Sequence, residues 1–213
     1  MSKNNSWDIS VKVKSYTPRK DHKSSGLNLE FTGKDAYFKL INTISRVAST
    51  YLPTYAFPPQ LINITENTTV AFDNQYMQLR LSNLPLYNLD LDIYHLHDKY
   101  WKNVNYADIN RDIHPSEKDI RFYVNVKNNT KELSYVTTND LEVYIDSSRV
   151  EMYNKKYPIL LIKLRPNDTF KCNMSAVLGI GEANAIWRAS VNSYAPYDDD
   201  KYNLHIIEFH QFD

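Results

Sequence analysis

The sequence has little cysteine and little glycine, with one and four of these residues among 213. The single cysteine, Cys172, excludes an internal disulfide and any zinc site made of several cysteines. We expect it to be a small, buried strand residue. Among the glycines only Gly179 and Gly181 stand close together. The third glycine of a dinucleotide-binding fingerprint is missing, because position 184 is Asn, so the pair does not indicate a nucleotide cofactor.

The chain also lacks an excess of either charge and lacks long apolar runs. Its 25 basic residues balance 25 acidic ones, so no overall basic charge is available to hold a phosphate backbone. A direct nucleic-acid role must therefore be local or absent. No apolar run approaches the ~20 residues that span a bilayer. The polar start, from Met1 to Trp7, has no signal-peptide core, and we predict an intracellular, soluble protein with no membrane segment.

What the sequence does contain is the composition of a folded protein, with 42% hydrophobic residues and 17 tyrosines. Several stretches have strand character: 7–13, 27–31, 61–65, 68–72, 120–126, 141–145, 159–164, 170–177 and 204–209. The first two alternate apolar and polar residues with the period of a strand. The first two favour a hairpin with a long loop. The pattern as a whole predicts an α+β fold, mostly antiparallel.

Residues 35–51 change to the period of a helix. Their apolar residues recur at the three-and-four spacing of one helical face: Tyr37, Leu40, Ile41, Ile44, Val47, Ala48 and Tyr51. Asp35 is a suitable N-cap, and Pro53 ends the helix just beyond the stripe. The simplest interpretation is that the stripe covers the sheet of its own domain. Its width leaves room for a second partner. A short helix is also predicted over 74–81.

Residues 88–119 have little periodicity and predict an irregular, exposed insertion. Carboxylates and imidazoles gather there, as ligands of zinc or manganese would: Asp90, Asp92, His95, His97, Asp98 and His114. However, His95 and His97 are two residues apart and miss the i, i+4 spacing of a helical zinc motif. A solvated acidic loop is the preferred interpretation. A metal-dependent hydrolase using Asp90, Asp92, His95 and His97 remains an alternative.

No other pattern predicts chemistry. Asp198-Asp199-Asp200 is a charge run in a turn, and three adjacent carboxylates cannot all face one metal from a strand. No Ser/His/Asp or Cys/His order is present. We therefore predict no catalytic residue, no metal and no cofactor.

Short motifs along the chain carry a resemblance to one family. They are Asn42-Thr43-Ile44-Ser45-Arg46, Leu52-Pro53-Thr54-Tyr55-Ala56, the run 79–86, the run 162–168, and Gly179 through Trp187. Their order and separation resemble the alpha-like subunit of cellular RNA polymerases, which includes bacterial alpha, its archaeal counterpart and the third-largest eukaryotic subunit. Ser45, Asn184 and Ile186 depart from the family pattern. The clustered cysteines that often bind zinc in the family are missing. Such departures are typical of a divergent member, for example from a large DNA virus.

The resemblance implies two intertwined subdomains. A dimerisation subdomain would comprise 1–54 and 196–213, and an inserted β-rich subdomain would comprise 55–195. The seven apolar residues of the 35–51 helix would pack against an eleventh-subunit-like partner, separate or fused. A second set would face the second-largest subunit: Asn42, Arg46, Gly179, Gly181 and Trp187.

By this resemblance the protein is a non-catalytic assembly subunit of a DNA-directed RNA polymerase. It would form a heterodimer, dock the large catalytic subunits and join other small polymerase subunits, with little direct nucleic-acid contact. It would reside in the nucleus or cytoplasm according to the host, or in the host cytoplasm or virion if viral. Family members follow the last strand with a long dimerisation helix, so here that helix would come from elsewhere or the sequence is a fragment. The alternative is a β-rich structural or virion protein with no polymerase role.

Overall fold

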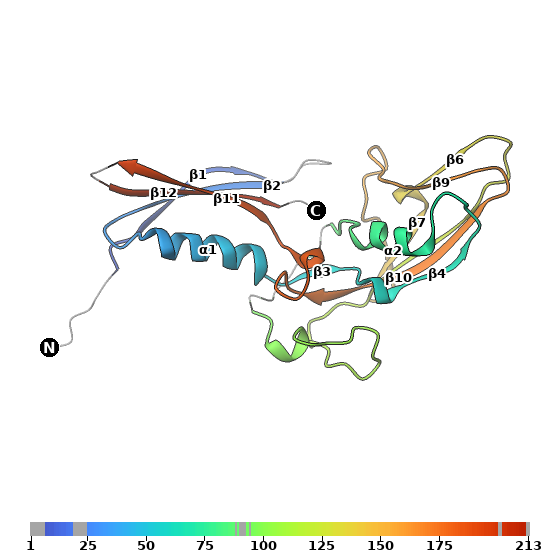
Figure 1. Cartoon of the computed structure of the whole chain (residues 1–213), viewed down its shortest axis with the longest axis horizontal. Coiled ribbons are helices and arrows are strands. Elements are labelled where there is room, and N and C mark those ends of the chain that lie inside the picture. The colour runs from blue at the N-terminus through green and yellow to red at the C-terminus, as the bar shows by residue number, and fades with distance from the viewer. Residues whose placement is uncertain are drawn as a thin grey trace. The chain divides into compact units, whose positions relative to one another are not determined.

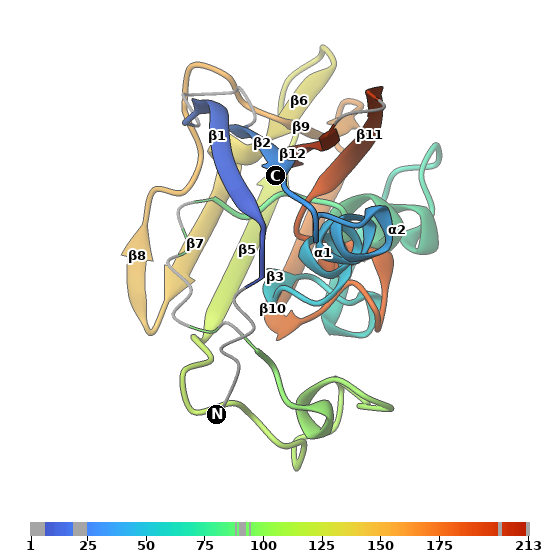
Figure 2. The same cartoon turned by 90° about the vertical axis from the view of Figure 1, so that its left-hand side faces the viewer.

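The computed structural model describes residues 7–18, 25–87, 89, 93, 95–199 and 202–211 (Figures 1 and 2). Within these residues the chain forms two α-helices and three antiparallel sheets, which confirms the predicted α+β fold. The chain divides into two compact units. Unit 1 consists of Met1–Leu52 and Arg188–Phe212, and unit 2 consists of Pro53–Trp187.

Unit 1 is a four-stranded antiparallel sheet with one helix on it. The strand order is β1-β2-β12-β11, where β1 is Ser10–Thr17, β2 is Ser25–Thr32, β11 is Val191–Asp199 and β12 is Tyr202–Gln211. The pairing of β1 with β2 confirms the predicted hairpin. Helix α1, Phe38–Thr50, packs on β11 and β12. The buried core between them is formed by Phe31, Ile41 and Ile207.

The start of α1 differs from the prediction. The helix begins at Phe38 with Tyr37 as its N-cap residue, and no side chain caps it. The carboxylate of Asp35 instead accepts hydrogen bonds from the backbone N–H of Asp8 at 2.9 Å and from the Tyr37 hydroxyl at 3.3 Å. This turn needs Gly33, because its φ is +131° and a Cβ there would lie 2.1 Å from the carbonyl oxygen of Asp8. Asp35 therefore holds the chain before β1 rather than the helix.

Unit 2 is built around β10, Thr169–Gly179. The sheet order is β3-β10-β5-β7-β8. Strand β4 also pairs with β10, along Phe170–Met174, whereas β3 pairs with the end of β10 at Val177–Gly179. The other strands are β3 (Thr54–Ala56), β4 (Ile62–Asn67), β5 (Ile120–Lys127), β7 (Leu141–Ile145) and β8 (Ser148–Val150). A separate two-stranded sheet joins β6, Ser134–Thr137, to β9, Leu160–Leu164. Strand β4 confirms the strand predicted over 61–65, whereas the second predicted stretch, 68–72, is not a strand.

The core of unit 2 lies on one face of this sheet. On β5, Ile120, Phe122 and Val124 are buried, and the intervening residues point outwards. Phe57 meets Phe122 edge to face, with ring centroids 4.8 Å apart. Helix α2, Asn74–Ser82, confirms the predicted short helix and buries Met77 and Leu81.

The stretch before β5 is irregular, as predicted, but it is not simply an exposed insertion. Leu96 is buried, and its carbonyl oxygen accepts a hydrogen bond from the Trp101 indole N–H at 3.1 Å. Further along, Arg111 and Glu117 form a bidentate ion pair whose shorter N–O distance is 2.5 Å. Both side chains are at least nine-tenths buried. Leu96 belongs to the buried core of unit 2, and the Glu117 carboxylate also accepts the backbone N–H of Leu178 at 3.4 Å, so the segment is attached to unit 2 at two places.

Candidate partner interfaces

The predicted apolar stripe of α1 divides between two directions. Ile41 is fully buried in the core of unit 1, so it is not available to a partner and is removed from the predicted interface. The remaining members form an outward row along the helix, which we call the helix stripe: Tyr37, Leu40, Ile44, Val47, Ala48 and Tyr51. Leu40 and Ala48 are half-buried, and Val47 and Tyr51 are 43% and 44% exposed.

Small polar residues explain why the apolar row can point away from the sheet. Ser45 lies on the buried side of α1, and its backbone carbonyl oxygen accepts a hydrogen bond from the Asn192 side chain. The Ser49 hydroxyl donates to the carbonyl oxygen of Ser190 at 2.8 Å. These bonds hold α1 against the chain leading into β11. The helix therefore attaches to its own unit through the Ile41 side chain, the backbone carbonyl oxygen of Ser45 and the Ser49 hydroxyl.

A second apolar row lies on β1, where all eight residues are exposed. Val11, Val13 and Tyr16 stand opposite Phe31, Leu29 and Leu27 of β2 in the antiparallel register. Opposite residues share a face, and Phe31 packs on Ile41 of α1. The β1 row therefore lies on the sheet face that carries the helix. In Figure 2, α1 is near β11 and β12 and away from β1.

Asn42 and Arg46, predicted to face the second-largest subunit, lie on α1 off the helix stripe. Arg46 is exposed and Asn42 is half-buried. Lys39, Thr43 and Arg46 recur on one side of the helix, so α1 presents a polar exposed side besides its apolar one. An exposed arginine is suited to bidentate contact with a carboxylate or with backbone carbonyls.

Gly179 and Trp187, from the same predicted set, are core residues of unit 2. The Trp187 indole N–H donates to the carbonyl oxygen of Val177 at 3.0 Å, so the ring lies across the end of β10. A Cβ at position 179 would come within 2.6 Å of that ring. Gly181 is partly exposed in the turn that follows β10. Gly179 and Trp187 are therefore buried, and they support the neighbouring surface without being exposed on it.

Aromatic and charged groups pack on Trp187 from the irregular segment. The Tyr106 ring lies 4.9 Å from the Trp187 ring, and the Arg111 guanidinium lies 5.9 Å from the Tyr106 ring. The Tyr106 hydroxyl is buried without a hydrogen-bond partner among the described residues. Burial raises the pKa of Tyr106 to about 12, so the phenol is neutral at physiological pH.

A hollow of about 480 Å³ opens beside this packing. Its walls come from three parts of unit 2: Pro58–Gln60, Trp101–Val104 with Tyr106, and Glu182–Asn184 with Ile186 and Trp187. The wall residues are mostly prolines, amides and aromatic or aliphatic side chains, with one cation, Lys102, and one carboxylate, Glu182. Such a mixed surface is suited to contact with a protein segment.

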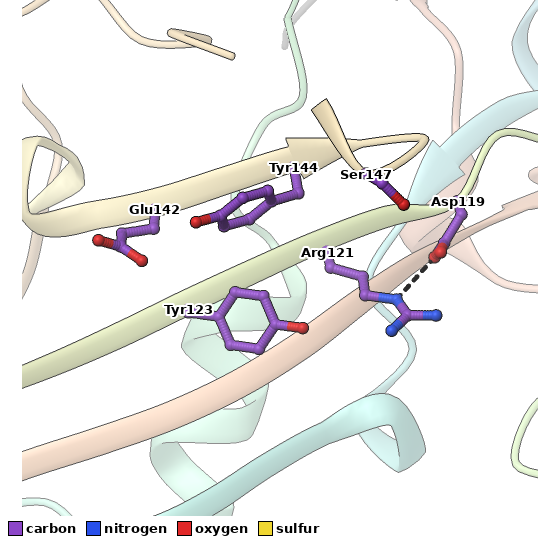
Figure 3. Close-up of a pocket in the computed structure, with 6 residues that line it drawn as sticks. All are labelled: Asp119, Arg121, Tyr123, Glu142, Tyr144 and Ser147. Carbon is purple, nitrogen blue, oxygen red and sulfur yellow. Dashed lines mark hydrogen bonds and ion pairs between the residues drawn. The ribbon is translucent and has the colours of Figure 1, made fainter. Parts of the chain in front are cut away.

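A second hollow, of about 440 Å³, lies on the outer face of the unit 2 sheet (Figure 3). It is lined by Asp119, Arg121, Tyr123, Glu142, Tyr144 and Ser147. The Tyr123 and Tyr144 rings meet edge to face at 5.8 Å, and Asp119 holds the Nε of Arg121 at 2.9 Å. That hydrogen bond raises the pKa of Arg121. The hollow offers polar contacts while its arginine is already balanced by Asp119. The sequence patterns do not identify it, although the alternation of β5 points Arg121 and Tyr123 outwards.

The described residues of the predicted metal-ligand cluster do not form a metal site. Asp90 and Asp92 lie outside the described residues. Across the residues that are described, no three His, Cys, Asp or Glu side chains gather closely enough to hold a metal. Nδ1 of His97 accepts the backbone N–H of Lys99, and Nδ1 of His114 accepts that of Ser116. These two histidines therefore stabilise turns.

The prediction that the single cysteine is a buried strand residue is confirmed. Cys172 is buried within β10, and burial raises the pKa of its thiol to about 12. The thiol is therefore protonated and unreactive at neutral pH. Neither α1 nor α2 has the length and apolar character that a membrane crossing requires, and the described residues contain no other α-helix.

No protein-family model matches the chain. Among curated proteins, the chain is similar to "Putative DNA directed RNA polymerase subunit R470" of Acanthamoeba polyphaga mimivirus, with 25% identity over 222 residues. The match covers 93% of this chain and therefore extends through both units. The chain spans 60% of the length of that relative. The comparison establishes a distant homology to a viral protein so described.

Proposed function

We propose that the chain is a non-catalytic assembly subunit of a multisubunit DNA-dependent RNA polymerase. The distant homology to the mimivirus protein supports the polymerase assignment. The observation that carries the assembly role is the helix stripe, an apolar row that a small folded unit turns away from its own core. Burying such side chains in a complex is worth about 1.5–3 kcal/mol for each one that becomes fully covered.

The occupant of this surface is the helix of a second alpha-like module, the eleventh-subunit-like partner. A helix that crosses α1 would place its apolar residues between those of the helix stripe, since residues three and four apart form the ridges of helix packing. The β1 row lies on the same sheet face and would extend the contact beyond the helix. The combined surface has the apolar centre typical of a permanent heterodimer.

The large catalytic subunits would dock on the remaining surfaces. Arg46 lies on the polar side of α1, where its exposed guanidinium can pair with a partner carboxylate. In unit 2, the hollow beside Trp187 would receive a loop of a large subunit. Gly179 and Trp187 then contribute by shaping the hollow. Other small polymerase subunits would join this assembly.

The test is recovery of a tagged chain from its native source in mild salt, with partners identified by mass spectrometry. We expect two very large polypeptides in equal amounts, together with the heterodimer partner. Ile44→Asp combined with Val47→Asp should abolish recovery of the heterodimer partner, because two charges would enter an apolar contact. Thr43→Asp is the matched control on the polar side of α1 and should retain it.

Both variants should keep the thermal stability of the unaltered chain, because all three positions are exposed. Recovery of the unaltered chain alone would contradict the proposal and favour the β-rich structural protein. Equal recovery of the heterodimer partner with the stripe variant would show that α1 is not the dimer surface.

A further inference from the structure

One end of unit 2 is a pair of loops joined by a buried asparagine. The Asn128 side chain is 2% exposed. Its amide nitrogen donates to the carbonyl oxygens of Glu132 at 2.8 Å and Leu164 at 3.0 Å. Its backbone carbonyl oxygen accepts from the backbone N–H of Asn167 at 2.8 Å. The loops between β5 and β6 and between β9 and β10 thus form one structure, the loop tip, comprising 127–133 and 163–168 (Figure 1, right).

The loop tip carries four exposed cations: Lys127, Lys131, Lys163 and Arg165. None of the four has a carboxylate partner within the described part of the chain. Elsewhere in unit 2, six cations are each paired with a carboxylate: Lys102, Arg111, Arg121, Arg149, Lys155 and Lys171. Arg80, Lys99 and Lys156 have no carboxylate partner among the described residues either, but they lie on three separate segments of the chain. The loop tip differs in that its four cations come from two loops that are hydrogen-bonded to each other.

Acidic residues cancel only part of this charge. The loop tip contains two, Glu132 and Asp168. The Asp168 carboxylate accepts the backbone N–H of Arg165 at 2.9 Å and so is turned back onto the loop. The loop tip thus has four cations against two carboxylates, whereas the protein as a whole has a formal net charge of zero. The hydrogen bonds of Asn128 hold the backbones of the two loops together.

An exposed aromatic ring stands beside the cations. Tyr135, at the start of β6, is 58% exposed and pairs with Lys163 of β9. The Lys163 ammonium lies 5.3 Å from the centre of the tyrosine ring. A flat ring among unpaired cations is the combination by which proteins hold single-stranded nucleic acid, because bases stack on the ring and phosphates pair with the cations.

We propose that the loop tip binds single-stranded nucleic acid independently of sequence. Single strands are favoured over duplexes, because a base must be unstacked before it can lie on Tyr135. An acidic protein would use the cations but not the ring face. The contact would be weak by itself, since only four cations take part, and would add to the binding of a larger assembly. It goes beyond the proposed assembly role and does not depend on it.

The test measures fluorescence anisotropy of a labelled oligothymidine with the purified full chain over a range of salt concentrations. We expect the logarithm of the binding constant to fall with the logarithm of salt by about 0.7 for each phosphate contacted. The loop-tip variant, with Lys127, Lys131, Lys163 and Arg165 all changed to Gln, should make this slope shallower by about 3. The control changes Lys99, Lys102, Arg149 and Lys156 to Gln, removes the same charge elsewhere in unit 2, and should leave the slope unchanged.

Tyr135 provides a second, independent readout. Tyr135→Ala should weaken binding on the order of tenfold at low salt without changing the slope, whereas Tyr135→Phe should bind as the unaltered chain does. Three outcomes would overturn the proposal: no binding at low salt, an equal loss of slope in the two quadruple variants, or equally tight binding of poly-glutamate. The last outcome would assign the loop tip to an acidic protein. Polymerase assembly should be unaffected in all these variants, so this proposal and the assembly role can fail separately.

Discussion

Single residues in this protein have roles that only their neighbours explain. Gly179 is required for the space it leaves, because its φ is not positive and the Trp187 ring occupies the position of a Cβ. Asn67 and Asn128 each begin an Asn-X-Thr triplet, and each side-chain amide donates a hydrogen bond to a backbone carbonyl oxygen of the loop that follows. The acceptors are Phe72 for Asn67 and Glu132 for Asn128, both at 2.8 Å. This turn explains why β4 ends at Asn67.

At this scale we predict that Gly179→Ala lowers the free energy of unfolding by about 1–3 kcal/mol, because the new methyl group overpacks against a rigid ring. Urea unfolding followed by tryptophan fluorescence measures the change. Trp187→Leu removes the ring, and in that background Gly179→Ala should cost much less. A cost that is the same in both backgrounds would show that the ring is not the cause.

At the scale of secondary-structure elements, sequence periodicity predicts the type of element but not its tertiary contacts. The period of 35–51 correctly predicts a helix, and its apolar residues cannot by themselves say which side faces inwards. That choice follows from the burial of Ile41 and from the hydrogen bonds of the Ser45 carbonyl oxygen and the Ser49 hydroxyl, whose partners lie more than 140 positions away in the sequence. Similarly, low periodicity before β5 correctly predicts irregular structure but not the buried ion pair of Arg111 and Glu117.

That ion pair yields a prediction for the irregular segment. Glu117→Gln should lower the free energy of unfolding by about 3–5 kcal/mol, because Arg111 would remain buried without its opposite charge. It should also speed proteolysis between residues 100 and 115. Glu151→Gln is the control, since it removes the partner of Lys155 in a fully solvated pair, and it should have no measurable effect. Equal protease resistance in both variants would contradict this role of the ion pair.

At the scale of the whole molecule, the two units have separate buried cores. The sheet of unit 1 is held together at its centre by β2 and β12, which come from opposite ends of the sequence. Their antiparallel pairing places Leu29 opposite Ile207. Its core is small, so its stability depends strongly on each buried side chain.

We therefore predict that the units unfold in two calorimetric transitions. Ile41→Ala should lower the transition of unit 1, with a cost of about 2–5 kcal/mol from the lost core contacts. Ile162→Ala makes the same change in the core of unit 2 and should lower the other transition. A single transition shifted equally by both substitutions would show that the cores unfold together.

The sequence by itself determined the α+β class, most strands, both helices, the buried Cys172 and the resemblance that led to the polymerase hypothesis. These follow from local periodicity and from short motifs, which are properties of neighbouring residues. Only the tertiary structure decided that Ile41 faces inwards, that Gly179 and Trp187 are core residues, and that the two loops carrying four exposed cations are joined by Asn128. The physical reason is that burial and charge pairing depend on contacts between segments distant in sequence, and no local pattern encodes which segments meet.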